Sequence, residues 1–331
     1  MLVNIKTVLT AQEIIDKAFL RASRIEEPYF PKKVDKIKRE VMDRISTIEA
    51  TSAPYLRKLV RQFPTLERLH PPFYRDLISL VFSVDRYKVS LAGIDWCAQR
   101  IEELSSHYIR MVKRATDAGE ALTLMKGFYG RFASLVRSQQ QNLAFLIECR
   151  NYIRSLPDID TECFTAIVAG MPNVGKSSLV SALTRARPRV APYPFTTQEV
   201  HIGFLTRDWV RVQLVDTPPG ILDRPMEERN EMERKAVLAL RDIDGIVLFL
   251  IDHSGTSGYT VEQQEGLYRE LSDILGKEVI RVQSKCDLSS ERRERICISA
   301  TTGYGLEELR GLLLERGELF ARQRADQAAR A

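Results

Sequence analysis

The sequence predicts two domains of different class: an all-helical bundle over residues 1–156, and an α/β domain with a mostly parallel sheet over residues 157–331. Apolar residues recur at three- and four-residue steps through the first part, which is typical of amphipathic helices. In the second part, short β-rich runs alternate with helical stretches, which is typical of a parallel sheet covered by helices. The length of 331 residues also suits about two domains.

The helical domain begins with a capping signal. Thr10 and Glu13 have the spacing of a capping box, which predicts the start of the first helix. The last helix is expected to run to about Leu156. Prolines predict the breaks between helices. They stand at Pro28–Pro31, Pro54, Pro64 and the Pro71-Pro72 pair.

Charge is unevenly spread between the two domains. Residues 1–156 contain 26 of the 49 Lys and Arg residues but only 17 of the 44 Asp and Glu residues, a net charge of +9, whereas residues 157–331 carry −4. A basic domain suggests a polyanionic partner. The alternative is a solvated helical surface that is rich in Lys and Arg, and charge alone does not separate the two.

Cysteine usage indicates a cytoplasmic protein. The five cysteines are scattered and form no Cys-x-x-Cys pair, which argues against disulfides and zinc ribbons and suits a reducing compartment. The N-terminus does not resemble a signal peptide. The longest apolar run, residues 246–251, is far shorter than the ~20 residues that a membrane-spanning helix needs, so no membrane partner is expected.

Six strands are expected in the α/β domain, and ligands are expected at the carboxyl ends of the parallel ones. A tight turn at Arg207-Asp208 predicts an antiparallel hairpin at one edge, and Trp209, which follows this turn, is expected to be a packing residue. Helices should follow Lys176, Glu227, Val261 and Gly305. The expected strands are Phe164–Ala169, His201–Leu205, Val210–Asp216, Ile246–Asp252, Val279–Gln283 and Ile296–Ser299.

A phosphate-binding loop directly follows the first expected strand. The spacing Gly-x-x-x-x-Gly-Lys-Ser, at the start of a helix, lets backbone N–H groups converge on phosphate oxygens. Lys176 can reach the β- and γ-phosphates, and the Ser177 hydroxyl can bind Mg²⁺. The residues expected to contact the nucleotide here are Gly170, Met171, Pro172, Asn173, Val174, Gly175, Lys176, Ser177 and Ser178.

Two later segments indicate that the base is guanine. Ser284-Lys285-Cys286-Asp287 resembles the Asn-Lys-x-Asp element of GTPases. The Asp287 carboxylate can accept two hydrogen bonds from guanine, whose donor pair adenine lacks, and the stem of Lys285 can cover the base. Ser299-Ala300-Thr301 resembles the Ser-Ala element, whose backbone N–H meets guanine O6. Asp287 therefore disfavours an ATPase.

Two further segments resemble the switch elements of GTPases. Asp216 ends a strand and precedes Thr217-Pro218-Pro219-Gly220, which resembles the element whose Asp holds Mg²⁺ through water and whose Gly N–H meets the γ-phosphate. The loop that contains Thr196 and Thr197 should supply a threonine to Mg²⁺, with Thr197 favoured. The expected metal ligands are Ser177, Thr197 and Asp216, and the expected catalytic residues are Lys176, Thr197 and Gly220.

Taken together, these motifs resemble a Ras-like phosphate-loop GTPase domain of the Obg superfamily over residues 160–310. Residues 193–197 (YPFTT), 223–252 (DRPMEERNEMERKAVLALRDIDGIVLFLID) and 257–263 (SGYTVEQ) resemble the nucleolar GTP-binding protein (Nog) family in its archaeal form. This resemblance implies a GTP-dependent factor for assembly of the large ribosomal subunit. It also implies binding of GTP or GDP and Mg²⁺, and contact with ribosomal RNA and protein through the basic bundle; no DNA partner is expected.

Three residues depart from the GTPase pattern. Pro219 adds a residue before Gly220, and a proline at the glycine position would have no N–H for the γ-phosphate. Ser284 replaces the usual Asn and has a shorter reach. Ile221 stands where many small GTPases have the Gln that orients the attacking water. Slow intrinsic hydrolysis is therefore expected, with catalysis from Mg²⁺, Lys176 and the backbone of the loop.

Several alternatives stay open. Asn173 either shapes the phosphate loop or binds K⁺, because its loop position resembles that of a potassium ligand in some related translation GTPases. The protein is either a switch that hydrolyses GTP or a GTP-binding scaffold with little hydrolysis, which Pro219, Ser284 and Ile221 favour. It acts either on ribosomal RNA or, as a signalling GTPase, on a protein partner.

Overall fold

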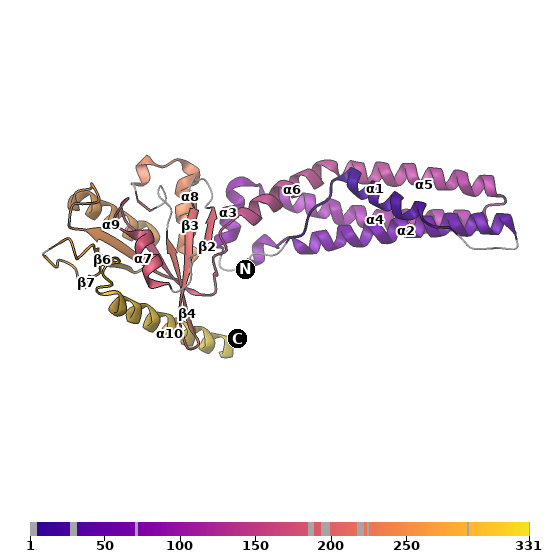
Figure 1. Ribbon diagram of the computed structural model, residues 1–331. Coiled ribbons are helices and arrows are strands. Elements are labelled where there is room, and N and C mark those ends of the chain that lie inside the picture. The colour runs from indigo at the N-terminus through magenta and orange to yellow at the C-terminus, as the bar shows by residue number, and fades with distance from the viewer. Residues whose placement is uncertain are drawn as a thin grey trace. The chain divides into compact units, whose positions relative to one another are not determined.

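A computed structural model describes residues 5–26, 32–69, 72–184, 189–192, 199–216, 222–223, 225–289 and 291–330. The chain divides into two compact units (Figure 1). One, the helical unit, consists of Leu2–Leu66 and Phe82–Arg154. The other, the α/β unit, consists of Glu67–Val81 and Ser155–Ala331.

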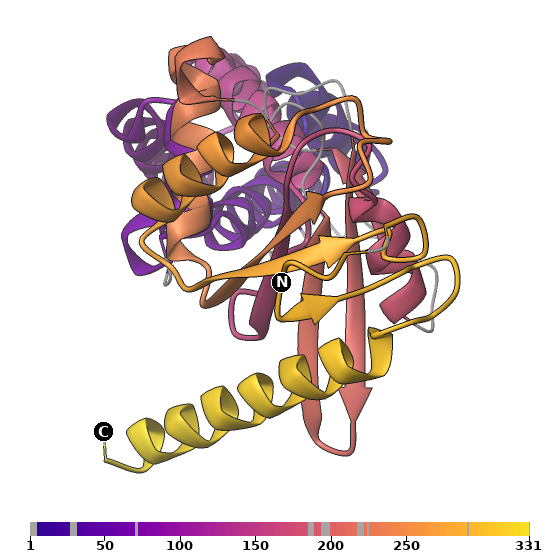
Figure 2. The same cartoon turned by 90° about the vertical axis from the view of Figure 1, so that its left-hand side faces the viewer.

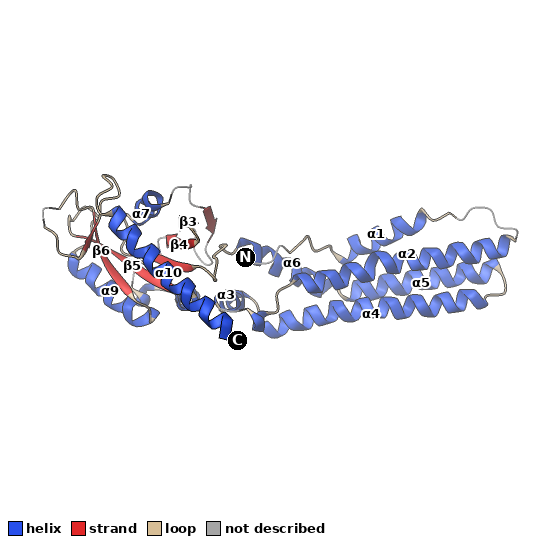
Figure 3. Cartoon of the chain, turned by 90° about the horizontal axis from the view of Figure 1, so that it is seen from below, coloured by secondary structure: helices blue, strands red, loops and turns tan. Residues whose placement is uncertain are grey.

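Long amphipathic helices form the helical unit. Figure 3 shows α2 (Lys33–Gln62), α4 (Val84–Arg114) and α5 (Ala118–Ser138) alongside one another, with α1 (Ala11–Ser23) packed on α2 and α5. Helix α6 (Gln140–Ser155) follows α5. The capping box is confirmed, since Thr10 Oγ1 accepts from Glu13 N at 3.3 Å and Glu13 Oε2 accepts from Thr10 N at 2.7 Å.

The break expected at Pro54 is wrong, because Pro54 lies inside α2. A proline within a helix costs about 3 kcal/mol through the lost hydrogen bond and the clash of its ring. Pro54 lies on the exposed side of α2, whereas Val41, Ile45 and Leu56 on the other side are fully buried. Burial of this apolar side contributes about 1.5–3 kcal/mol per side chain, which offsets the cost of one proline.

A seven-stranded sheet forms the centre of the α/β unit, in the order β2-β3-β4-β1-β5-β6-β7. The six expected strands are all present, and the pairs β4–β1, β1–β5, β5–β6 and β6–β7 are parallel. The seventh strand, β2, adds a short antiparallel edge next to β3. The bounds are β1 Phe164–Ala169, β2 Arg189–Pro192, β3 Glu199–Arg207, β4 Val210–Asp216, β5 Gly245–Asp252, β6 Val279–Ser284 and β7 Ile296–Cys297.

Helices cover both faces of this sheet, as expected for the alternating pattern (Figure 2). Helices α7 (Lys176–Leu183) and α10 (Leu306–Arg330) pack on one face, and α8 (Glu231–Ala239) and α9 (Val261–Leu275) lie on the other. The expected hairpin is confirmed: β3 and β4 pair up to Arg207 and Val210. Trp209 lies at its turn and is 62% exposed, so the expectation that it packs is wrong.

Helix α3 (Phe73–Val81) belongs to the α/β unit although it lies between α2 and α4 in sequence. It packs against α8 and the short 3-10 helix η3 (Leu240–Asp242) of the α/β unit. The buried hydroxyl of Tyr74 also lies 2.9 Å from Pro157 O and 2.7 Å from Ile159 O, just before β1. A division by sequence order at residue 156 does not reveal this packing. No described helix is both long and apolar enough to cross a membrane.

Candidate functional site

The loop after β1 has a backbone that only glycine tolerates at its first position. Gly170 has φ +138°, and a Cβ atom there would lie 2.7 Å from Leu250 O of the neighbouring strand β5. Gly175, with φ +99°, is the N-cap of α7. The loop therefore ends with the N–H groups of a helix N-terminus, which favours an anion.

The ammonium of Lys176 is enclosed by this loop. Lys176 Nζ donates to Gly170 O at 2.8 Å and to Met171 O at 3.0 Å, and the residue is 7% exposed. Burial lowers the pKa of Lys176, whereas the carboxylates of Asp223 and Asp216 act to raise it. A buried cation beside a helix N-terminus provides strong electrostatic attraction for a phosphate group.

Asp216 and Ser177 fit a magnesium ion. Asp216 ends β4 with 3% exposure, and its Oδ2 lies 3.3 Å from His201 Nδ1. Its other oxygen, Oδ1, is buried and has no hydrogen-bond partner within the described parts of the chain. Ser177 lies in the first turn of α7. Carboxylate and hydroxyl oxygens are the hard ligands that Mg²⁺ prefers.

The remaining switch residues cannot be placed. Thr196, Thr197, Pro219, Gly220 and Ile221 lie outside the described residues. Asp223, which was not predicted from the sequence, is buried next to the phosphate loop: the preceding residue Leu222 accepts a hydrogen bond from Gly170 N at 3.2 Å. Its sequence signals were an acidic residue three positions after Gly220 and its place at the start of the family-like stretch 223–252.

A cavity of about 300 Å³ lies beside the phosphate loop and unites the two expected base-reading segments. Asp287, an exposed carboxylate, is on its wall, where it can accept hydrogen bonds from a base. The predicted residues that line the cavity are Asn173, Val174, Gly175, Ser178, Ser284, Lys285, Asp287, Ala300 and Thr301. Residues that were not predicted also line it, namely Leu250, Thr256, Leu288 and Ile298.

Ser299 does not line this cavity but supports the loop that does. Its side chain is buried, and Ser299 Oγ accepts a hydrogen bond from Thr302 N at 3.1 Å. Ser299 N donates to Tyr304 O at 3.0 Å, and Ser299 O accepts from Gly303 N at 3.0 Å. These bonds fix the tight turn that brings Ala300 and Thr301 to the cavity.

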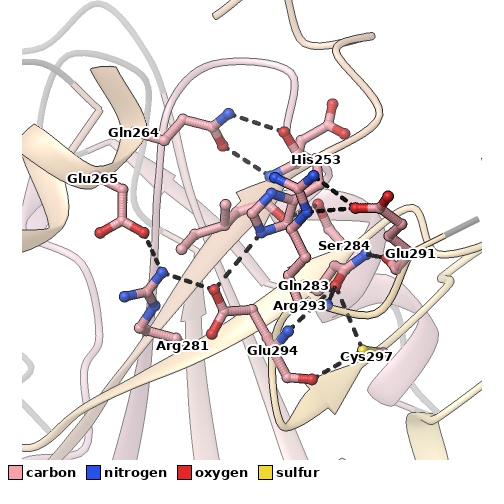
Figure 4. Close-up of polar contacts among 12 residues, drawn as sticks. His253, Gln264, Glu265, Arg281, Gln283, Ser284, Glu291, Arg293, Glu294 and Cys297 are labelled. Atoms are coloured by element: carbon pink, nitrogen blue, oxygen red, sulfur yellow. Dashed lines mark hydrogen bonds and ion pairs between the residues drawn. The ribbon is translucent and has the colours of Figure 1, made fainter. Parts of the chain in front are cut away.

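A polar network around the buried Gln283 joins β6 to the segment that follows it (Figure 4). Gln283, at the end of β6, donates through Nε2 to Glu291 O and accepts at Oε1 from Arg293 N, each at 2.8 Å. Arg281 forms ion pairs with Glu265 and with Glu294, the latter at 2.7 Å. Gln283 was not predicted as part of the site; its signal was a polar residue inside an apolar strand.

Comparisons with known proteins identify a family for each part of the chain. Residues 3–160 match the family described as NOG1 N-terminal helical domain, and residues 165–285 match the family described as 50S ribosome-binding GTPase. An uncharacterized protein of Methanocaldococcus jannaschii is 32% identical over 290 residues, which cover 87% of this chain and 81% of that protein.

Two eukaryotic relatives are also similar. Nucleolar GTP-binding protein 1 of Encephalitozoon cuniculi is 36% identical over 76% of this chain and 48% of its own length. The Arabidopsis thaliana protein of the same name is 32% identical over 86% of this chain and 43% of its own length. The chain thus spans less than half of these two relatives. Because both family models match and these relatives are more than 30% identical over most of this chain, the chain belongs to the nucleolar GTP-binding protein family.

Proposed function

We propose that the chain is a GTP-binding switch that hydrolyses GTP slowly and acts in assembly of the large ribosomal subunit. The observation that carries this proposal is the continuity of the site. Asn173, Val174 and Gly175 belong to the phosphate loop and also line the base cavity that contains Asp287. A guanine nucleotide can therefore place its phosphates at Lys176 and its base at Asp287 at the same time.

Each end of the nucleotide has its own chemistry in this site. The N–H groups at the start of α7 and the ammonium of Lys176 attract the negatively charged β- and γ-phosphates. They also stabilise the negative charge that develops on the leaving oxygen during hydrolysis. Ser177 and Asp216 would hold Mg²⁺, together with Thr197 as the sequence suggests. When bound, Mg²⁺ neutralises phosphate charge and orients the β- and γ-phosphates.

Base selection provides the first test. In Asp287→Asn the carboxylate that accepts from the guanine N1–H and amino group becomes an amide, whose N–H groups match the oxygen at position 2 of xanthine. We expect affinity for GDP to fall at least tenfold and affinity for xanthosine diphosphate to rise, measured by calorimetry with Mg²⁺. Unchanged preference in this variant, or no guanine-nucleotide binding by the unmodified protein, would overturn the proposal.

Hydrolysis provides the second test, because the alternative is a scaffold that binds GTP but hydrolyses little. Ile221 cannot orient an attacking water, and this sequence observation favours the scaffold. Phosphate release over several turnovers, with and without large ribosomal subunits, separates the two. Comparing KCl with NaCl tests whether Asn173 binds K⁺: equal rates in the two salts would leave it only the role of shaping the loop.

A ribosomal RNA partner is proposed for the helical unit. Its net positive charge supports this, and so does the name of the family that matches the GTPase part, 50S ribosome-binding GTPase. Lys32 and Lys33 are exposed at the start of α2. Their reversal to Glu should weaken RNA binding by the full chain and reduce its salt dependence, because fewer counterions are released.

Two control measurements complete this test. The exposed acidic residue Asp85, at the start of α4, offers a matched control: Asp85→Lys should not weaken RNA binding. Salt-independent binding would favour a signalling GTPase with a protein partner. Sedimentation of a lysate with a non-hydrolysable GTP analogue then shows whether the chain migrates with large subunits.

A further inference from the structure

The Asn position of the base-reading element is occupied here by Ser284, which lines the base cavity but uses its hydroxyl within the sheet. Ser284 is buried, and its hydroxyl donates to Ile251 O of the neighbouring strand β5 at 3.3 Å. This hydroxyl proton is therefore used within the sheet. A serine committed in this way leaves the cavity without the side-chain amide that the usual Asn provides.

The neighbouring Lys285 is held by a different segment, the turn that follows β5. Lys285 has a left-handed backbone, with φ +54°. Its Nζ lies 2.9 Å from Asp252 Oδ2 and 2.8 Å from Thr256 Oγ1. Because the aliphatic stem ends at this fixed ammonium, Asp252 and Thr256 together determine where the stem crosses the cavity wall.

Asp252 is a fully buried carboxylate whose bonds converge on this turn. Its Oδ1 accepts from Ser254 N at 2.8 Å, and its Oδ2 also accepts from Thr256 Oγ1 at 3.1 Å. Burial acts to raise the pKa of Asp252, but hydrogen bonds from Ser254 and Lys285 outweigh burial and lower it. The residue therefore stays ionised and keeps the charge that attracts Lys285.

The start of this turn, Asp252, is anchored to α9. Gln264, which is fully buried, accepts from Asp252 N at 2.8 Å and donates to Asp252 O at 3.0 Å. Thr256, at the other end, is exposed and lines the base cavity. The turn thus holds Lys285 at both of its ends, through Asp252 and through Thr256.

We propose that residues 252–256 form a third base-reading segment of the guanine-nucleotide site. Asp252 and Thr256 are the positioning residues of this segment: both bind the ammonium of Lys285, so the Lys285 stem lies on the cavity wall before the base binds. Prearrangement lowers the entropy cost of binding, since Lys285 carries a flexible side chain that is already ordered. This inference rests on the guanine-nucleotide binding of the proposed function.

Two variants of Thr256 test its hydroxyl. Thr256→Val keeps the shape and removes the hydroxyl, and should weaken GDP binding about three- to tenfold, the value of one lost hydrogen bond. Thr256→Ser restores the hydroxyl and should bind within about twofold of the unmodified protein. Thr206→Val, an exposed residue of β3 outside the cavity, is the matched control and should change nothing. Calorimetry with GDP, inosine diphosphate and Mg²⁺ gives all affinities.

A double-mutant cycle tests the positioning role of Asp252. Asp252→Asn should weaken GDP binding about tenfold or more, because Lys285 loses its charged partner. Lys285→Met keeps an apolar stem without the ammonium. If Asp252 acts through Lys285, adding Asp252→Asn to Lys285→Met should cause no further loss. A purely structural role of Asp252 would instead give additive losses, with a lowered melting temperature in both backgrounds.

The outcomes separate this inference from the proposed function. If the unmodified protein binds GDP but Thr256→Val binds equally well and the cycle is additive, the third base-reading segment does not exist and guanine-nucleotide binding stands. If the unmodified protein binds no guanine nucleotide, the proposed function itself fails. Should Asp252→Asn not fold, Thr256→Val with its Ser rescue still decides the matter.

Discussion

The hydroxyl of Tyr74 offers the sharpest test of how α3 joins the α/β unit. Tyr74→Phe removes one oxygen and leaves the ring, which packs edge-on against Phe73 at 5.0 Å between centroids. The lost hydroxyl proton is shared between Pro157 O at 2.9 Å and Ile159 O at 2.7 Å. Burial raises the pKa of Tyr74, so the hydroxyl stays a donor throughout the ordinary pH range.

The magnitude follows from burial. Pro157 O also accepts from Ile159 N at 2.9 Å, so the carbonyl of Ile159 is the acceptor that depends most on Tyr74. A buried carbonyl left without its donor costs about 1–3 kcal/mol. For a unit of this size, each kcal/mol shifts the melting temperature by about 2–4 °C. We therefore expect a loss of about 2 kcal/mol and a decrease of roughly 4–8 °C.

The two tryptophans of the chain make the assay specific. Trp209 lies in the α/β unit and Trp96 in the helical unit, so Trp96→Phe leaves a single fluorescent reporter of the α/β unit. Urea unfolding in this background should show the shift in the Trp209 signal. Tyr129→Phe, which keeps its ring stacked on Phe19 in the helical unit, is the control and should leave the Trp209 transition unchanged. A shift below about 0.5 kcal/mol for Tyr74→Phe, the size expected of an ordinary surface change, would refute the reasoning.

Three further predictions concern the α/β unit. Gly170→Ala should abolish GDP binding measured by calorimetry, because the added Cβ would lie 2.7 Å from Leu250 O at a φ that only glycine adopts; normal affinity would contradict this. Burial and the carboxylate of Asp76 raise the pKa of Asp242 in the folded protein. As the pH rises, the Asp242 carboxyl is therefore deprotonated in the unfolded chain at a lower pH than in the folded protein, and the free energy of unfolding falls as the pH rises above the ordinary Asp range. Asp242→Asn should therefore gain stability over the unmodified protein at pH 7 but not at pH 3 in urea titrations, and a pH-independent difference would oppose this. Burial and the neighbouring Cys297 raise the pKa of Cys286 to about 11, so its alkylation should be slow at pH 7.5 and should accelerate about tenfold per pH unit below that pKa; fast labelling at pH 7.5 would argue against it.

The parallel strands could be predicted because each is a short apolar run followed by polar motif residues. Since the carboxyl ends of parallel strands meet at one edge of a sheet, the same pattern also predicts that Asp216 and Asp287 share an edge. The extra strand β2 escaped because only four residues pair, and pairing at a sheet edge has no periodic signal. Pro54 gave a wrong prediction, because packing of the apolar face overrides local propensity.

The sequence revealed only some of the residues of the base site. Motif spacing revealed Lys285 and Asp287, because the Lys-x-Asp spacing is typical of the guanine-reading element of GTPases. Asp252 ends β5 and Thr256 lies just after it, so the two reach Lys285 only through the fold, from 33 and 29 residues away in sequence, and the motif search did not reveal them. A buried acid at the end of an apolar strand is a usable signal, since such a carboxylate must find a partner.

Because of the position of α3, the Tyr74→Phe variant also tests how the nucleotide state could affect RNA binding. Helix α8 follows the switch segment around Gly220, and α3 packs on α8 in the same unit. In sequence, α3 is joined to α2 on one side and to α4 on the other, and these are the two longest helices of the helical unit. If the γ-phosphate displaces α8, then α3, which packs on α8, must adjust, and α3 is continuous with those two helices. A difference in RNA affinity between GDP and a non-hydrolysable GTP analogue would therefore require a firmly held α3. In Tyr74→Phe this difference should shrink while nucleotide affinity is preserved; an undiminished difference would mean that the nucleotide state reaches the helical unit by another route.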